Sequence, residues 1–262
     1  MIFLLGEDLF REGLKTYFAK YSWKNTTLDQ FIAEFTAAAQ RAQLPIDFKA
    51  WSDTWLTKAG CASLRLTYDH DEQTRVISNL KLVQEPYNLA GTPENMLRNQ
   101  AIQIASLDDQ MQVIEVKRVE TSETETETAI TDAFVGPSAK PIRAFLINYE
   151  CQGYAKFEVD ELTMRALETD LHKIEVSRER KSVLNIMYDQ VKSGKLPASR
   201  VIRAIINNLD KETAVDVLQD TLRFVAPTVL KTYLHDEAVE ARSTDLYELV
   251  LRIMQGGKFS ED

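Results

Sequence analysis

The spacing of apolar residues changes near residue 60 of this 262-residue chain. Before that point apolar residues recur at helical spacing, and Phe48, Trp51 and Trp55 form one stripe at positions i, i+3 and i+7. After Gly60, residues 64–68 alternate between apolar and polar, which is the period of a half-buried strand. The pattern therefore predicts a helical unit that leads directly into a β unit.

Three helices are predicted in the first unit. The first covers residues 6–21 and carries an aromatic stripe, and residues 45–47 open the third. The second begins at Thr27, which fits a capping box with Gln30, and continues to about Ala42. We expect the tryptophans to be core residues, with a ligand stacked on them as the alternative. The second helix is expected to bury Leu28, Phe31, Ile32 and Phe35.

The β unit contains four or five strand candidates. Residues 108–110 predict a hairpin loop, and residues 85–94, with two prolines and a glycine, predict a longer surface connection. The candidates are 63–68, 75–84, 99–107, 111–120 and 143–159.

Glutamate and threonine alternate along residues 120–128, ETSETETET. Threonine favours strands, and like charges along one face oppose stacking against another sheet. We therefore predict an exposed edge strand. A calcium site is the alternative, although calcium ligands converge from a turning loop rather than from one face of a strand.

Beyond Asp160 the pattern is helical. We predict four helices, at 161–174, 177–192, 197–209 and 211–225. Gly194 is expected to stop the second, Pro197 lies in the first turn of the third, and Asp210 can cap the fourth. Pro227 is expected to start a new stretch of two helical segments that end near Gln255. Helices of this length joined by short loops are typical of stacked helical hairpins.

The expected fold is α+β and multidomain, with a short helical N-terminal unit, a small β-sandwich and a C-terminal α-helical hairpin array. We place the divisions at residues 1–58, 59–159 and 160–262.

Composition and charge argue against a nucleic-acid-binding, membrane-spanning or disulfide-stabilised protein. The formal charge of −9 argues against a nucleic-acid partner, and the densest basic cluster, Arg178–Lys181, is interpreted as a solvated helix face. The apolar start, residues 1–5, is too short to span a membrane and reads as the tail of a buried helix. Cys61 and Cys151 give no disulfide framework and predict two reduced, partly buried thiols in a soluble, intracellular protein.

Four segments resemble zinc aminopeptidases of the aminopeptidase N family. They are residues 5–18 (LGEDLFREGLKTYF), residues 55–65 with Trp55-Leu56, Ala59-Gly60 and Leu64-Arg65, the pair of Asn148 with Tyr154–Lys156, and residues 187–196 (MYDQVKSGKL). The resemblance implies the end of a catalytic domain, a β-sandwich domain and the start of a HEAT-like helical domain, in that order.

The family removes N-terminal residues from peptides with one zinc ion, which is held by the two histidines of His-Glu-x-x-His and a downstream glutamate. The glutamate inside the motif activates water, and a tyrosine stabilises the oxyanion. This sequence has His70, His172 and His235, none with a second histidine at i+4, and it has no His-Glu-x-x-His or Gly-x-Met-Glu-Asn. No catalytic, cofactor-binding or metal residue is therefore predicted here. Zinc belongs to the family only, and the chain is expected to be inactive alone.

Three hypotheses follow. The chain is a structural or complementing portion of a zinc metalloaminopeptidase, partnered by a chain with the catalytic domain, or it is a non-catalytic homologue that serves as an interaction subunit of a larger complex. The interaction subunit would expose apolar surface where missing parts once packed, expected at Phe3, Leu4, Leu5 and the C-terminal helices. The third hypothesis is an independent hydrolase in which Cys61 or Cys151 meets a histidine.

Overall fold

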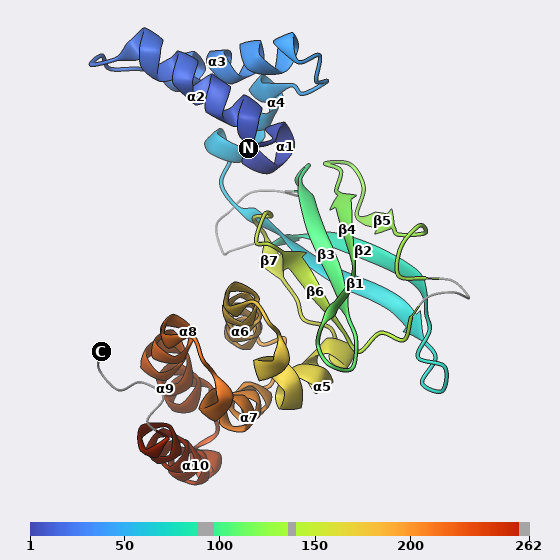
Figure 1. Ribbon diagram of the computed structural model, residues 1–262, viewed down its shortest axis with the longest axis vertical. Helices are drawn as coiled ribbons and strands as arrows, with labels where there is room; N and C mark the ends of the chain where they lie inside the picture. The colour runs from blue at the N-terminus through green and yellow to red at the C-terminus, as the bar shows by residue number, and fades with distance from the viewer. Residues whose placement is uncertain (88–96, 136–139, 257–262) are drawn as a thin grey trace.

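The computed structural model describes residues 1–87, 97–135 and 140–256. The fold is α+β, as predicted. An N-terminal helical unit, a pair of packed sheets and a C-terminal group of helices follow one another along the chain, and Figure 1 shows them in that order in space. The helical unit lies at one end of the longest axis, the sheets lie in the middle, and the C-terminal helices flank the sheets.

The N-terminal unit is close to the prediction. It comprises α1 (Ile2–Leu5), α2 (Glu7–Tyr21), α3 (Leu28–Arg41), α4 (Phe48–Ser52) and a π-helical turn (Asp53–Thr57). The capping box is confirmed, because the Thr27 hydroxyl accepts from the Gln30 amide at 3.3 Å and Gln30 Oε1 accepts from the Thr27 amide at 2.9 Å. The prediction for Leu28 is wrong. It is the first residue of α3 and points to solvent, whereas Ile32 and Phe35 are buried.

The packing of α2 against α3 depends on a glycine. Gly13 is the buried residue of α2, and a Cβ there would lie 2.7 Å from Cδ1 of Phe35. Phe35 is fully buried and packs among Phe10, Phe31 and Phe48. Gly13 therefore lets the two helices approach closely enough to enclose the phenylalanine.

Two antiparallel-rich sheets form the β-sandwich. The four-stranded sheet has the order β5-β2-β1-β7 and the three-stranded sheet the order β4-β3-β6. The hairpin predicted at 108–110 joins β3 to β4, and a short parallel pairing joins Ser63 and Leu64 of β1 to Lys156 and Phe157 of β7. The strands are β1 (Cys61–His70), β2 (Ile77–Tyr87), β3 (Ala101–Leu107), β4 (Val113–Glu120), β5 (Glu127–Ala129), β6 (Ala144–Tyr149) and β7 (Lys156–Phe157).

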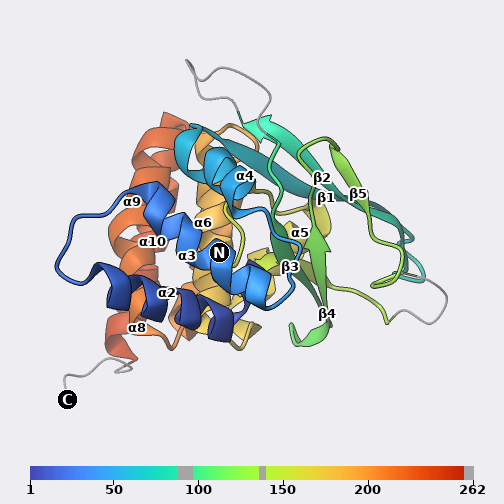
Figure 2. The ribbon, with the colours of Figure 1, turned by 90° about the horizontal axis from the view of Figure 1, so that it is seen from above.

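Strands β3 and β6 are buried on both faces. Ile102, Ile104, Phe145 and Ile147 face the other sheet and form a core with Leu64, Leu66, Leu80 and Leu82. The intervening residues, including Ala105, Leu107, Ala144 and Leu146, belong instead to the core of the C-terminal helices. The helices therefore cover the outer face of the three-stranded sheet, as the view from above shows (Figure 2).

The acidic run is not a continuous strand. Glu120 ends β4, residues 121–126 form an irregular connection, and only residues 127–129 make the short edge strand β5. Thr121 is buried, and its hydroxyl donates to the carbonyl of Arg98 at 2.6 Å, so the residue after β4 turns inward instead of continuing an exposed strand. Of the surface connection predicted at 85–94, residues 85–87 extend β2, and the rest lies outside the described residues.

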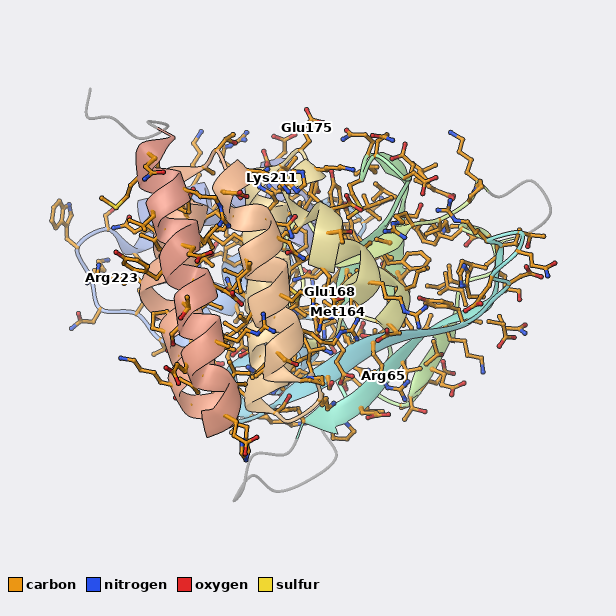
Figure 3. All side chains as sticks on the ribbon, turned by 90° about the horizontal axis from the view of Figure 1, so that it is seen from below. Arg65, Met164, Glu168, Glu175, Lys211 and Arg223 are labelled. Atoms are coloured by element: carbon orange, nitrogen blue, oxygen red, sulfur yellow. The ribbon has the colours of Figure 1, made fainter. Side chains whose placement is uncertain are left out.

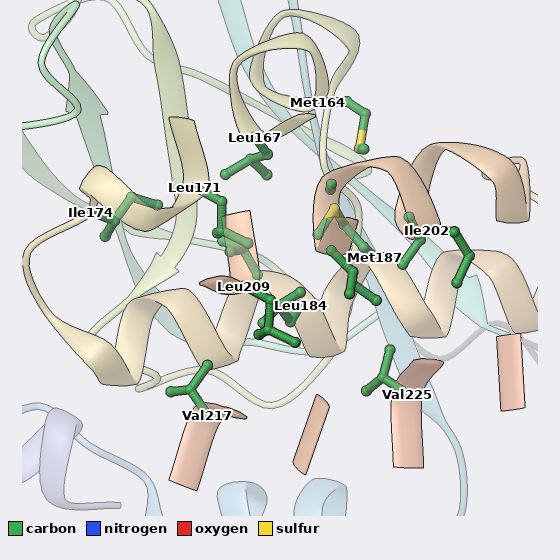
Figure 4. Close-up of a cluster of buried hydrophobic side chains, with 14 of the residues drawn as sticks. Met164, Leu167, Leu171, Ile174, Leu184, Met187, Ile202, Leu209, Val217 and Val225 are labelled. Carbon is green, nitrogen blue, oxygen red and sulfur yellow. The ribbon is translucent and has the colours of Figure 1, made fainter. Parts of the chain in front are cut away.

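The C-terminal helices pack around one apolar cluster. Figure 4 shows Met164 and Leu167 of α5, Leu184 and Met187 of α6, and Ile202 of α7 turned toward one another. The helices are α5 (Glu161–Asp170), α6 (Ser177–Lys192), α7 (Ala198–Asn208), α8 (Val215–Asp220), α9 (Ala226–Thr228) and α10 (Asp236–Gln255), with 3-10 turns at Leu171–Lys173 and Leu209–Lys211. Gly194 follows α6 with a φ of 72°, as expected of a helix stop.

Two boundary predictions in this region are wrong. Pro227 does not restart the chain, because residues 215–233 form one continuous helical segment in which π-helical turns, Thr221–Val225 and Val229–Tyr233, flank the proline. Such widened turns tolerate a missing backbone N–H. Asp210 does not cap this segment either. Glu212 accepts from the amides of Thr213 and Ala214, both at 2.8 Å.

The basic cluster Arg178–Lys181 is not a solvated face. Arg180 is buried and its guanidinium forms an ion pair with the equally buried carboxylate of Glu212, with an Nε to Oε2 distance of 2.8 Å. Glu179, within the cluster, is also buried and pairs with Arg178. The pair joins the start of α6 to the segment before α8, so the cluster connects helices. Glu168 of α5 and Arg200 of α7 form another ion pair between helices, which is less deeply buried; Figure 3 labels Glu168 on α5.

Candidate functional site

The candidate site is a cleft between the helical unit and the β-sandwich. It consists of two adjoining hollows of about 530 Å³ and 170 Å³. Residues 45–55 supply one wall, and the segment that enters β3 supplies the other. The residues that line both hollows are Trp51, Trp55, Asn99, Gln100 and Ala101.

Two stacked tryptophans form the aromatic wall of the cleft. The ring centroids of Trp51 and Trp55 are 6.4 Å apart with 27° between the ring planes, and Tyr154 meets Trp55 edge-on at 6.3 Å. Both tryptophans are half-buried and line a cavity, so the prediction that they are core residues is only partly right. Phe48, on the same stripe, is the fully buried member.

The buried side chain of Arg98 packs against the ring of Trp55 and supports this wall. Its guanidinium carbon lies 4.8 Å from the ring centroid of Trp55, and its side chain is 1% exposed. The guanidinium donates to the carbonyl oxygens of Thr54, of Lys58 at 3.2 Å and of Gly60 at 2.8 Å. These carbonyls lie at the end of the π-helical turn, where helical partners run out. Arg98 thus holds the helical unit on the β-sandwich.

Gln100 brings a buried polar group to the cleft. Its side-chain Oε1 accepts from the amide of Tyr154 at 3.0 Å, and the residue is 6% exposed. Its Nε2 is enclosed and has no hydrogen-bond partner among the described residues, and the same holds for Nε of Arg98. An enclosed donor without an acceptor costs free energy, and Gln100 carries this donor in the lining of both hollows.

The rim of the larger hollow is negative. Asp47, Glu120 and Glu123 line it together with one basic residue, Arg118, within the described chain. Arg118 Nη2 lies 2.8 Å from Glu120 Oε1, and Glu123 Oε1 accepts from the Thr54 hydroxyl at 3.0 Å. Three carboxylates thus face one guanidinium at the rim, and this excess of negative charge favours a positively charged group.

The three histidines lie apart from this cleft. His172 Nδ1 is 2.7 Å from Oδ1 of Asn208, so His172 connects the 3-10 turn after α5 to the end of α7. His235 precedes α10. His70 ends β1, and its Nε2 is enclosed without a partner among the described residues.

The two cysteines differ from each other. Cys61 is half-buried, and burial raises the pKa of its thiol, which disfavours the reactive thiolate. Cys151 is exposed, which corrects the prediction of a partly buried thiol there. Within residues 1–87, 97–135 and 140–256, no three histidine, cysteine, aspartate or glutamate side chains are grouped to hold a metal ion. The donor set of the described residues therefore does not fit a zinc ion.

Sequence reasoning missed Arg98 and Gln100. Their sequence neighbours carry no recognisable motif, and their contacts with Thr54, Lys58 and Tyr154 span about 40 or more residues. No helix in the described part of the chain is long and apolar enough to cross a membrane.

Comparison with known proteins places these features in context. No protein-family profile matches the chain. The chain is similar to aminopeptidase N of Streptomyces lividans, with 25% identity over 266 aligned positions that cover all of this chain. The aligned region is 30% of the length of the Streptomyces protein, so the chain spans about a third of the relative that it matches.

Proposed function

We propose that this chain is an architectural portion of a peptidase related to aminopeptidase N, and that it supports a catalytic part carried by another segment or chain. The observation that carries the proposal is the similarity to the Streptomyces enzyme along the whole of this chain. We further propose the division into residues 1–58 as the tail of a catalytic-type domain, 59–159 as the β-sandwich domain and 160–262 as the start of a helical domain.

Contacts at the joints support this role. Gly60, at the joint between the helical unit and β1, has a φ of 95°, a conformation that favours glycine. Lys156 Nζ of β7 lies 2.7 Å from Asp189 Oδ2 of α6, and Gln190 Oε1 accepts from the amide of Val159 at 3.0 Å. All but Val159 belong to the segments that resemble the family, so three of the four similar segments contribute to the joints between the units.

The chemistry of the proposed peptidase would come from outside the described residues. Removal of an N-terminal residue in this class uses a zinc ion, and the donor set described above does not fit one. The contribution of this chain is therefore to hold neighbouring units in a fixed relation.

The proposal is tested by recovering the chain from its source with an antibody raised against residues 1–262. The expected product is a longer polypeptide or a complex that contains zinc and hydrolyses a fluorogenic aminoacyl amide, whereas the isolated 262-residue chain does not. Lys156→Met should lower that activity more than Lys192→Met, because Lys156 joins β7 to Asp189 of α6 at 2.7 Å. Lys192 is the matched control: it is more exposed, lies on α6 itself and contacts the same carboxylate at 3.4 Å. Hydrolysis by the isolated chain, or recovery only in a zinc-free form, would contradict the proposal.

A second candidate is a non-catalytic interaction subunit. It is favoured by Trp23, which is fully exposed at the turn between α2 and α3; Phe18 near the end of α2 and Leu28 at the start of α3 are exposed as well. The prediction of exposed apolar surface is wrong for Leu5, which is buried. It is confirmed for the C-terminal helices, where Tyr247 and Met254 of α10 are exposed. The side chains of Phe3 and Leu4 lie outside the described set. Zinc-free complexes with unrelated subunits would favour this candidate.

A further inference from the structure

We propose that the cleft lined by Trp51, Trp55 and Gln100 binds a peptide segment that carries a basic side chain. This inference goes beyond the proposed function, because it assigns a ligand to a chain for which that proposal gives only an architectural role. It rests on an aromatic wall and an unpartnered buried amide that both hollows share, and on the negative rim of the larger hollow.

The aromatic wall provides the apolar contact. Trp51 and Trp55 are stacked, half-buried, and shared by both hollows, which together are large enough for several side chains. Arg98 and Tyr154 hold Trp55 in place, so the wall is formed before a ligand arrives. Preformed aromatic surface binds with little loss of side-chain entropy.

The amide of Gln100 selects for an acceptor. Its Oε1 already accepts from the Tyr154 amide, which fixes the side-chain orientation and leaves Nε2 enclosed without an acceptor in a residue that lines both hollows. A backbone carbonyl oxygen of a peptide is an acceptor that this donor fits, and the bond would remove the cost of an enclosed, unsatisfied N–H.

The rim selects for positive charge. Asp47, Glu120 and Glu123 outnumber Arg118 there, and Arg118 already contacts Glu120. A lysine or arginine side chain that leaves the aromatic wall therefore meets carboxylates, whereas an acidic peptide meets like charge.

The test is a fluorescence titration of the 262-residue chain carrying Trp23→Phe. This change removes the fully exposed tryptophan, so that Trp51 and Trp55 report on the cleft. The probe is acetyl-Lys-Phe-Lys-amide, and acetyl-Glu-Phe-Glu-amide is its charge-reversed control. We expect saturable quenching or shift of the emission by the lysine probe and at least about tenfold weaker binding of the glutamate probe.

Matched variants assign the binding to the cleft. Glu123→Gln and Gln100→Met should each raise the Kd of the lysine probe several-fold, whereas Glu125→Gln in the same acidic run and Gln103→Met further along β3 should leave it unchanged. If a cleft variant fails to fold, hydrogen exchange of the Trp23→Phe chain decides instead, with slower exchange at residues 99–101 on probe binding as the expected result. Equal affinity for both probes, no saturable signal, or equal effects of the cleft and control variants would overturn the proposal.

Discussion

Arg98 covers the ring of Trp55 while it caps the end of the helix that carries Trp55, and 4.8 Å separates its guanidinium carbon from the ring centroid. One side chain thus satisfies the carbonyls of Thr54, Lys58 and Gly60 and supports the aromatic wall of the cleft. The helical unit and the β-sandwich depend on this residue for their relative position.

Replacing Arg98 should destabilise the joint. Arg98→Met leaves buried carbonyl oxygens without donors, and we expect the free energy of unfolding to fall by about 3 kcal/mol. Arg98→Lys should recover little, because an ammonium cannot spread its donors as the planar guanidinium does. Urea unfolding measures the change. Arg165→Met, which removes an exposed pair with Glu161, is the control and should cost less than about 1 kcal/mol. An equal loss of unfolding free energy in Arg98→Met and Arg165→Met would show that Arg98 does not hold the helical unit to the β-sandwich.

The buried pair of Arg180 with Glu212 should be sensitive to loss of either member. Arg180→Met leaves the Glu212 carboxylate enclosed without its cation, and a cost of about 3–5 kcal/mol is expected. The double variant Arg180→Met/Glu212→Met should cost less than the single Arg180 change, since no uncompensated charge remains. Chemical denaturation of the three variants provides the comparison, and a larger loss in the double variant would argue against a charge-based explanation.

The same pair predicts an acid-dependent loss of stability. Burial by itself raises the pKa of Glu212, but hydrogen bonds from Arg180 and the Ala214 amide outweigh it, so the pKa lies below its ordinary value of 4.5. A lowered folded-state pKa stabilises the fold above the unfolded-state value, and this contribution is lost as pH falls through the folded-state pKa. The difference in unfolding free energy between the wild type and Glu212→Gln should therefore shrink below about pH 4.5. A constant difference from pH 7 to pH 3 would contradict the assignment.

Gly13→Ala should strain the helical unit. The added methyl group would meet Phe35 at 2.7 Å, and overpacking of this kind costs about 1–3 kcal/mol, partly offset by the better helix propensity of alanine. The double variant Gly13→Ala/Phe35→Leu should cost less than the sum of the two single changes, because leucine leaves room for the methyl group. A thermal unfolding cycle measures the coupling, and strict additivity would exclude the proposed clash.

Loss of the capping box of α3 should lower the free energy of unfolding less than the changes above. Thr27→Ala removes the acceptor for the Gln30 amide and should cost about 1 kcal/mol. Thr244→Ala, at a hydroxyl that bonds within exposed α10, serves as a control and should be close to neutral. If both changes have the same effect on the melting temperature, the cap is not a source of stability.

Local patterns predicted the elements better than their connections. The bounds of α6, the capping box at Thr27 and the β3–β4 hairpin follow from residues within a few positions of one another, and all three are confirmed. The helix through Pro227 was missed because flanking π-helical turns, which have no sequence signature, absorb the effect of the proline.

Features that depend on distant partners could not be predicted. The cluster at Arg178–Lys181 reads as solvated until Glu212, 32 residues away, is placed beside Arg180. The cleft likewise arises from residues 45–55 and 99–101, which meet only after the sheets form, and the polar group that gives it chemical character, Gln100, is indistinguishable in sequence from a surface glutamine.

The parallel pairing of Ser63 and Leu64 with Lys156 and Phe157 has a consequence for synthesis. The ribosome must add roughly ninety further residues after β1 before β7 exists, which takes on the order of ten seconds at typical elongation rates. Throughout that interval one edge of β1 presents unpaired N–H and C=O groups to neighbouring nascent chains. Pairing of Ser63 and Leu64 at this edge is therefore a late event when the chain folds during translation.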